Sequence, residues 1–380
     1  MKIGFDGKRA TQNFTGLGNY SRYIIEILCR YYPHNEYILY APKKRSNKML
    51  ELLLSQFQCV NISFPVQSCW KRLSSIWRIW GISKQIQKDE IQIFHGLSNE
   101  LPLNIRQAKG IKSVVTIHDL IFLLFPQYYP IIDRTIYAYK FRKACQNADK
   151  IIAISECTKR DIIRFFHIPE KKIEVIYQGC DSSFQKTASA DTKKKAQIKY
   201  SLPHRYILNV GSIEERKNIL LIVQAMPHLP KDVHLVIIGK KTSYTEKVEH
   251  YINENNLADR IHILSNVPFD LLPAIYQQAE VFVYPSRYEG FGIPIIEALH
   301  SGVPVVAATG SCLEEAGGPD SIYVNPDNVE ETTNILDRLL SDPGERERMV
   351  SQGKEYVKRF SEKEQGQSLF KLYQKLNKDI

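Results

Sequence analysis

The stretch that decides the fold is VFVYPSRYEGFGIPIIEALHSGVPVV, residues 281–306. It begins with four apolar residues that predict a buried strand, breaks at Pro285 and passes through a glycine turn at 290–292. We expect a helix over 293–302 and a second apolar strand over 303–308. In such a unit, the first helical turn presents free backbone N–H groups and the positive end of the helix dipole. The sequence therefore predicts an anion-binding site at this turn.

Two carboxylates bracket the turn. Glu289 lies on the loop and Glu297 lies about one turn past the helix start, so both can reach one site without sharing a role. A carboxylate repels phosphate but accepts hydrogen bonds from paired hydroxyls. We therefore expect Glu289 to contact a sugar ring, Glu297 a ribose diol, and the amides of Phe291, Gly292 and Ile293 the phosphates. The alternative is that both glutamates are solvated or capping residues.

The frame E-G-F-G-I-P-I-I-E-A-L-x-S-G-V-P-V-V, which starts at Glu289, resembles the EX7E motif of the retaining, nucleotide-sugar-dependent glycosyltransferases of family 4. The match is specific because both acids, the GFG turn and the downstream G-x-P-V-V strand coincide. The resemblance implies the α/β GT-B fold, in which two Rossmann-like domains face each other across a cleft.

Strands alternate with helical segments along the chain, which predicts a parallel, doubly wound sheet in each half. We assign residues 1–185 to an acceptor-side Rossmann-like domain and residues 201–360 to a nucleotide-sugar-binding one. The polar segment 186–200 lacks apolar periodicity and is interpreted as the linker. By resemblance, a C-terminal helix over 361–380 crosses back onto the first domain.

A pair of cations follows the first strand of the second half. Arg216 and Lys217 lie in the frame G-S-x-E-x-R-K-N, and two adjacent cations that face a helix N-terminus can clamp a diphosphate. The family places an R-K pair here, although Ser212 stands where many members have arginine. The resemblance also makes Gly211 a substrate-binding candidate and Val267 part of a segment whose backbone holds the nucleotide base.

Candidate site residues in the first half follow two predicted strands. Strand 114–119 delivers His118 at its carboxyl end, where open α/β sheets place their ligands. The family often keeps a histidine here, so we expect His118 to contact donor or acceptor near the transferred sugar, with Asp119 orienting it. The resemblance makes Gly16 and Gly18 candidates for close backbone approach to the donor or the acceptor.

Length and composition bound the class of protein. The 380 residues suffice for two domains, and no run of about 18 apolar residues is present to span a bilayer. The N-terminus lacks a basic region followed by an apolar one, so we expect a cytoplasmic protein. Seven scattered cysteines without a C-x-x-C pair are expected to be reduced.

The net charge of +10 is unevenly distributed. Residues 1–185 contain 27 Lys and Arg against 15 Asp and Glu, whereas the remainder has a net charge of −2. This asymmetry favours contact with anionic lipid at the inner face of the cell membrane, and a merely soluble basic surface is the alternative. A basic nucleic-acid-binding protein is a remote alternative because no motif for it is present, so we expect no nucleic-acid partner.

All three tryptophans lie within residues 70–80. On a single helix, Trp70, Leu73, Trp77 and Trp80 would share one face, with cations off it. Such a pattern is typical of an interfacial helix or a lipid-acceptor groove. An ordinary core-facing helix explains the stripe equally well.

Together these features predict a hexosyltransferase with Glu289, Arg216, Lys217 and His118 as its catalytic residues, and the resemblance to the family implies that it retains the anomeric configuration. The cations and the helix N-terminus would stabilise the leaving diphosphate, so we expect no metal and no cofactor beyond the nucleotide-diphosphate sugar co-substrate. Residues 115–120 look most like mannosyltransferases, which favours mannose from GDP-mannose over glucose. The acceptor would be a glycan or lipid-linked molecule in cell-surface polysaccharide synthesis. A nucleotide-sugar epimerase or a soluble sucrose- or starch-type synthase of the same fold is the alternative.

Overall fold

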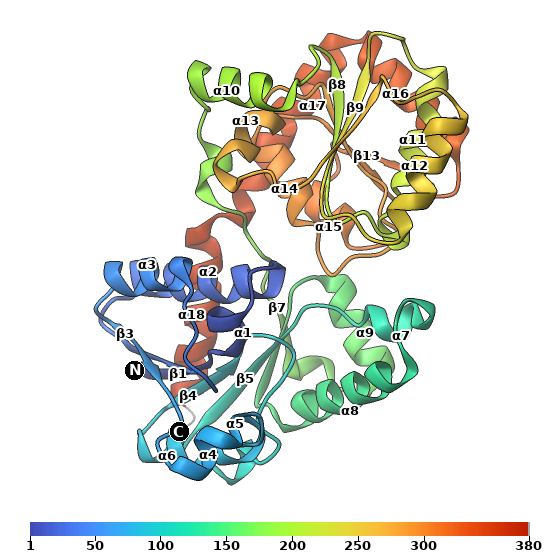
Figure 1. The fold of residues 1–380 in the computed structure, drawn as a ribbon. Helices are drawn as coiled ribbons and strands as arrows, with labels where there is room; N and C mark the ends of the chain where they lie inside the picture. The colour runs from blue at the N-terminus through green and yellow to red at the C-terminus, as the bar shows by residue number, and fades with distance from the viewer. Residues whose placement is uncertain (379–380) are drawn as a thin grey trace. The chain divides into compact units, whose positions relative to one another are not determined.

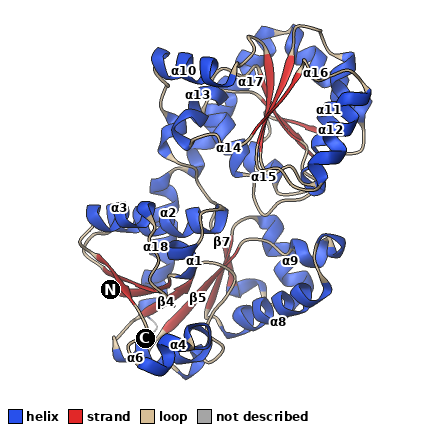
Figure 2. Ribbon diagram, viewed as in Figure 1, coloured by secondary structure: helices blue, strands red, loops and turns tan. Residues whose placement is uncertain are grey.

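The computed structural model describes residues 1–378, and the chain divides into two compact units (Figure 1). Unit 1 comprises Met1–Tyr177 and the C-terminal segment that begins at Glu362, and unit 2 comprises Gln178–Ser361. The division therefore follows Tyr177 rather than residue 185, because the turn after the last strand of unit 1 already leads into unit 2. Each unit is a parallel sheet flanked by helices (Figure 2).

Unit 1 contains seven parallel strands in the order β3-β2-β1-β4-β5-β6-β7. Apart from the two edge strands, most of their side chains are buried on both faces, which explains why the inner strands read as short continuous apolar runs. The order reverses direction between β1 and β4, the arrangement of a Rossmann sheet. The strands are β1 (Lys2–Asp6), β2 (Glu36–Tyr40), β3 (Val60–Ser63), β4 (Ile93–Gly96), β5 (Lys112–Ile117), β6 (Lys150–Ala153) and β7 (Ile173–Val175).

Helices cover both faces of this sheet. The start of α9 illustrates the local signals, because Ser155 Oγ accepts a hydrogen bond from the amide of Thr158 at 2.9 Å. The helices are α1 (Lys8–Gln12), α2 (Gly16–Tyr31), α3 (Lys48–Gln56), α4 (Ser68–Arg72), α5 (Ser74–Ile76), α6 (Ile82–Lys88), α7 (Ile121–Leu124), α8 (Ile131–Asn147), α9 (Glu156–Phe166) and α18 (Glu362–Lys378), with the π-helix η1 (Trp77–Gly81) before α6.

The last helix, α18, packs within unit 1 although it follows unit 2 in the sequence. The Tyr373 hydroxyl is hydrogen-bonded to His95 Nδ1 at 2.6 Å, and both residues are fully buried. Glu362 at the start of the helix pairs with Arg30 of α2 at 2.5 Å. Leu369, Leu372 and Leu376 complete the hydrophobic core beside α2.

The tryptophan segment does not form the single amphipathic helix that the spacing predicted. It is broken into α4, α5 and the π-helix η1, and the wider π turn rotates the later side chains out of register. Trp77 is 1% exposed and belongs to the core, whereas Trp80 and Leu73 are each 50% exposed. The four residues therefore do not share one face.

Unit 2 contains six parallel strands in the order β10-β9-β8-β11-β12-β13, again with a reversal at its centre, between β8 and β11. The strands are β8 (Tyr206–Val210), β9 (His234–Ile238), β10 (Ile261–Leu264), β11 (Val281–Tyr284), β12 (Val305–Ala308) and β13 (Ile322–Val324). The helices are α10 (Ala190–Tyr200), α11 (Ile219–Ala225), α12 (Tyr244–Glu254), α13 (Leu272–Tyr276), α14 (Ile293–His300), α15 (Leu313–Gly317), α16 (Val329–Ser341) and α17 (Pro343–Tyr356).

The segment 186–200, expected to be a linker, instead contains α10 and belongs to unit 2. Ser189 caps the helix by accepting a hydrogen bond from the amide of Thr192 at 3.2 Å. The sequence of this segment shows no apolar periodicity because α10 buries only Ala196. Good helix formers, namely alanine, lysine and glutamine, sustain the helix in place of a buried face.

Candidate functional site

The site in unit 2 forms where the sheet order reverses. β8 and β11 are neighbours, and the segments that follow them diverge, which is where parallel sheets place their ligands. After β8 come Gly211 and the short helix η6 (Glu215–Lys217), and after β11 comes the loop of residues 285–292. The two segments are joined because the amide of Arg287 donates to the carbonyl of Arg216 at 2.9 Å.

Glu289 stands at the centre of this site. Its Oε1 accepts hydrogen bonds from Lys217 Nζ at 2.6 Å, Ser286 Oγ at 2.7 Å and the Tyr284 hydroxyl at 3.1 Å. The same oxygen pairs with Arg216 Nη1 at 3.0 Å. The structure therefore brings together the carboxylate and the two cations that the sequence singled out.

The charges in this cluster stabilise one another. Burial alone would raise the pKa of Glu289, but Lys217 and Arg216 outweigh it and lower that pKa to about 2. Burial alone would lower the pKa of Arg216, but Glu289 raises it above its ordinary value. Glu289 and Arg216 are therefore both ionised at neutral pH, and the side chains of Glu289, Arg216 and Lys217 are only 12–13% exposed.

Tyr284 supports the cluster and was not identified from the sequence. Its hydroxyl accepts a hydrogen bond from Lys217 Nζ at 2.5 Å, and the ammonium lies 5.0 Å from the centre of its ring. The available signal was its place as the last residue of an otherwise apolar strand, since a buried hydroxyl there needs a polar partner.

The glycine turn leads into α14, which begins at Ile293 as expected. Gly292 has a φ of +134°, a conformation that side-chain-bearing residues rarely adopt. The loop before it is held from behind, because Cys312 Sγ donates to the carbonyls of Glu289 at 3.0 Å and Phe291 at 2.8 Å. The amides at the start of α14 thus lie at the positive end of a helix dipole, close in sequence to Glu289.

Glu297 lies in a different environment from Glu289. Its Oε2 accepts a hydrogen bond from the Tyr276 hydroxyl at 2.9 Å. Burial raises the pKa of Glu297 to about 7, against the lowering effect of that hydrogen bond, and Asp181 adds to the rise. Tyr276 was missed because it lies on α13, far from the motif in sequence. The two glutamates of the motif therefore differ in charge behaviour near neutral pH.

Gly211 and Val267 are two further candidate residues of unit 2, and their positions relative to the Glu289 cluster differ. A side chain on Gly211 would point toward Tyr284 and Lys217, with its first carbon 3.7 Å from the ring and 3.8 Å from Lys217 Cε. Gly211 therefore borders the cluster. Val267 lies in the loop after β10, which is separated from β11 by β8 and β9, and its contact with a base stays a prediction.

His118 follows β5 in unit 1 and is buried. Its amide donates to Asn99 Oδ1 at 2.8 Å, and its Nε2 contacts the carbonyl of Leu97 at 2.9 Å, which requires the proton on Nε2. The ring of Tyr20 meets it edge-on at 4.5 Å. Burial lowers the pKa of His118 to about 4, although the bond to Leu97 opposes this, so the ring is neutral at pH 7.

Gly16 and Gly18, both at the start of α2, have different surroundings. A side chain on Gly18 would come within 2.0 Å of the Asn13 carbonyl oxygen, so a contact inside the protein explains this glycine. Asn13 Oδ1 also accepts a hydrogen bond from the Gly18 amide at 3.1 Å, which caps the start of α2. At Gly16 no atom lies within 4 Å of the position a side chain would take, and its approach to a ligand stays a prediction.

A second charged cluster, missed from the sequence, lies beside the reversal point of the sheet in unit 1. Arg78 pairs with Asp6 at 2.5 Å and with Glu100 at 2.7 Å, and all three side chains are at most 15% exposed. Lys140 of α8 approaches Glu100 at 3.6 Å. Asp6 ends β1, so the cluster lies at the carboxyl end of that strand, and only the fold reveals its partners.

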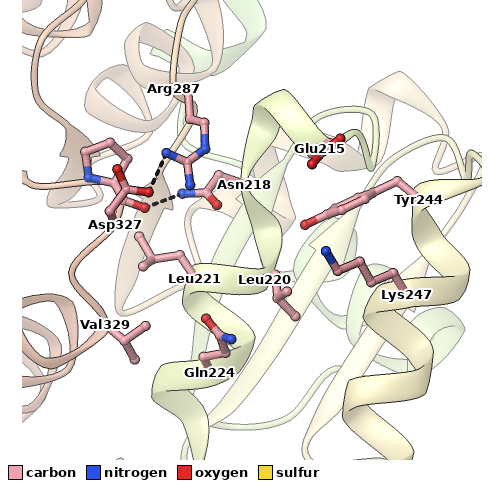
Figure 3. A pocket seen from close by; sticks show the side chains of 11 residues that line it. Glu215, Asn218, Leu220, Leu221, Gln224, Tyr244, Lys247, Arg287, Asp327 and Val329 are labelled. Atoms are coloured by element: carbon pink, nitrogen blue, oxygen red, sulfur yellow. Dashed lines mark hydrogen bonds and ion pairs between the residues drawn. The ribbon is translucent and has the colours of Figure 1, made fainter. Parts of the chain in front are cut away.

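A pocket of about 210 Å³ is lined by residues of η6, of α11 and of the loop after β11 (Figure 3). Its wall includes Glu215 of η6 and Arg287, which pairs with Asp327 at 2.6 Å. Asn218 Nδ2 donates to the carbonyl of Pro326 at 2.8 Å and closes the same wall. Figure 3 shows that these interactions tie both segments to the loop after β13. They stabilise the backbone that presents Arg216 and Lys217.

Within residues 1–378, no three His, Cys, Asp or Glu side chains are grouped so that they could hold a metal ion. No described helix is both long and apolar enough to cross a membrane. The predicted absence of a metal and of a cofactor remains a prediction.

Comparisons with known proteins cover both units. Residues 21–184 match the family described as Glycosyltransferase Family 4, and residues 191–356 match Glycosyl transferases group 1. The chain is 32% identical over 275 residues to O-antigen chain mannosyltransferase B of Escherichia coli, covering 71% of this chain and 70% of that protein. It is 27% identical over 250 residues to O-antigen chain mannosyltransferase RfbU of Salmonella typhimurium, covering 65% of each.

Among solved structures, Anabaena HepE (Alr3699) in complex with UDP and glucose superposes with a TM-score of 0.77. The match covers 99% of this chain and 100% of that chain at 18% sequence identity, and at this identity it shows the fold alone.

Proposed function

This chain belongs to glycosyltransferase family 4, and from this membership we propose that it transfers mannose from GDP-mannose to a lipid-linked or polysaccharide acceptor. The predicted family and the predicted GT-B fold, with two Rossmann-like sheets, are confirmed. Hexose transfer from a nucleotide sugar follows from that membership. The similarity to two O-antigen mannosyltransferases supports mannose over glucose.

One observation carries the proposal: Arg216, Lys217 and Glu289 meet where the sheet of unit 2 reverses, beside the N-terminus of α14. In the proposed complex, the two cations and the amides of Gly292 and Ile293 bind the diphosphate of the donor. As the bond to the sugar breaks, negative charge grows on the diphosphate. The same groups then stabilise it more strongly than they stabilise the intact donor.

We assign the two glutamates to hydroxyl recognition. Glu289 would release the cations to the diphosphate and accept hydrogen bonds from the sugar hydroxyls. Glu297 would accept from the ribose diol as a carboxylate, a form that becomes the majority above its pKa of about 7. Neutral His118 in unit 1 would contact the donor or acceptor near the transferred sugar.

The finer points of the reaction are part of the proposal. Retention of anomeric configuration follows from the resemblance to the family. Metal independence is supported by the two cations beside the helix N-terminus, which supply positive charge where a divalent ion would otherwise act. We place the enzyme in the cytoplasm at an anionic membrane surface, because the basic excess lies in residues 1–185.

The test is transfer by the purified protein from GDP-mannose or UDP-glucose to a lipid-linked acceptor, with and without a chelator. Products are scored for the new linkage, for its anomeric configuration and for epimerised donor. Lys217→Ala should reduce transfer by about 100-fold or more. The matched control is Lys241→Ala, which removes an exposed lysine paired with Glu249 and should leave transfer unchanged. Full transfer by Lys217→Ala, or epimer formation alone, would refute the proposal.

A further inference from the structure

Helix α8 of unit 1 carries apolar side chains on two opposite faces. On the inner face, Phe141, Ala144 and Cys145 are buried in the core. On the outer face, Ile132, at 70% exposed, begins a row of apolar side chains. The row continues at helical spacing through Ile136, which is 44% exposed, and Tyr139, which is 54% exposed. The helix is thus packed on one side and leaves a second apolar row in solvent.

This outer row is continued by basic residues. Lys143 follows Tyr139 by one helical turn on the same face, and Arg142 adjoins it. At the C-terminal end of α8 lies a pocket lined by Lys143, Arg106, Lys172 and His167, with no acidic residue in its lining. The cations there are held in place, because Arg106 Nη2 and Lys172 Nζ donate to the carbonyl of Gln146 at 2.5 and 2.9 Å. A row of apolar side chains therefore leads into a fixed cationic cluster.

We propose that this outer face of α8, defined by Ile132, Ile136, Tyr139 and Lys143, docks on the surface of an anionic phospholipid membrane. The apolar side chains enter the boundary between head groups and acyl chains, and the cations contact the lipid phosphates. A nucleic acid would match the cations but not the row of isoleucines. This inference rests on the proposed function at a membrane, and it places the contact on α8 instead of the tryptophan segment.

The position of α8 connects this surface to the rest of unit 1. Phe122 of α7, four residues after His118, packs edge-on against Phe141 at 5.3 Å and against Tyr137 at 5.8 Å. Lys140 of the same helix reaches Glu100 in the buried cluster of Arg78. Docking through α8 therefore holds the carboxyl ends of β1 and β5 at a fixed distance from the lipid surface, which suits an acceptor anchored in that surface.

The experiment measures binding of the full-length protein to phosphatidylcholine vesicles with and without phosphatidylglycerol, by co-sedimentation at low and high salt. The double variant Ile132→Ser/Ile136→Ser should bind vesicles that contain phosphatidylglycerol about ten-fold more weakly than wild type. Arg142→Ala/Lys143→Ala should lose binding that depends on phosphatidylglycerol. The matched control is Ile198→Ser, a 69% exposed isoleucine on α10 of unit 2, which should bind as wild type does.

Transfer to a detergent-solubilised acceptor separates this inference from the proposed function. The α8 variants should keep that activity and the thermal stability of wild type, because the substituted side chains are exposed or half-buried and lie outside the core. Wild-type vesicle binding by the isoleucine double variant, or no vesicle binding by the wild type, would overturn the docking surface. Vesicle binding that depends on α8, together with no transfer from any nucleotide sugar, would support the docking surface and refute the proposed function alone.

Discussion

Glu289→Gln should separate diphosphate binding from sugar transfer. In the free protein, Glu289 Oε1 lies 2.6 Å from Lys217 Nζ and 3.0 Å from Arg216 Nη1, so the carboxylate takes the place that we assign to the donor phosphates. A diphosphate must displace it. The glutamine variant has no charge to displace, and we expect it to bind GDP more tightly while it transfers sugar poorly.

The pKa of Glu289 gives the size of this effect. It is about 2, against an ordinary value of 4.5, after the opposing effect of burial. Each pKa unit corresponds to about 1.4 kcal/mol, so the cations stabilise the ionised form of Glu289 over its protonated form by a net free energy of about 3 kcal/mol. Because the folded-state pKa is lowered, this stabilisation is fully present above pH 4.5 and is lost as the pH falls through about 2. At pH 7, GDP affinity should therefore rise by up to about 100-fold in the variant.

Isothermal titration calorimetry with GDP and with GDP-mannose, at constant salt, measures this directly. The control is Glu280→Gln, which removes a similarly buried carboxylate that pairs with Arg205 at 2.6 Å and with Arg346 at 3.7 Å. It should leave GDP affinity unchanged. Weaker GDP binding by Glu289→Gln than by wild type would show that the carboxylate supports the diphosphate, and the displacement argument would fail.

Three further outcomes are expected. Gly292→Ala should destabilise unit 2 by about 2 kcal/mol in denaturant titrations because of its positive φ, whereas Gly16→Ala, with open space around it, should be neutral; equal effects would contradict this. Glu297 has a folded-state pKa of about 7, raised above 4.5, so wild-type stability falls as the pH rises between these values. The free energy of unfolding of Glu297→Gln, taken relative to wild type, should therefore rise by about 3 kcal/mol between pH 4.5 and pH 8. A difference between the two proteins that does not change with pH would refute the assignment. Asp6→Asn should lower the free energy of unfolding of unit 1 by about 3 kcal/mol, since it leaves the buried Arg78 with one partner fewer; a change below about 1 kcal/mol would contradict it.

The motif around the glycine turn could be predicted in detail because its signals are local. The strand β11, the turn at Gly292 and the start of α14 at Ile293 each depend on residues within a few positions. The meeting of Lys217 with Glu289 was also predictable in outline. Both follow neighbouring strands of a Rossmann sheet, whose carboxyl ends lie at one edge.

The rest depends on packing that the sequence does not display. Tyr276 meets Glu297 only because α13 lies beside α14, and Arg78 reaches Asp6 across 72 positions of sequence. The tryptophan segment was misjudged because a helical wheel assumes one unbroken α-helix, whereas a π turn begins at Trp77. The exposed row on α8 was not recognised from the sequence because the helix carries apolar residues on two opposite faces, so its sequence shows no single apolar side.

The return of α18 to unit 1 bears on how the chain is made. Leu369, Leu372 and Tyr373 are each at most 1% exposed in the core beside α2, and they are synthesised only after the whole of unit 2. Unit 2 is contiguous, so its sequence is complete before the first-synthesised sheet receives its final helix. The core of unit 1 therefore cannot be completed until unit 2 has been synthesised, although the sheet of unit 1 precedes unit 2 in the chain.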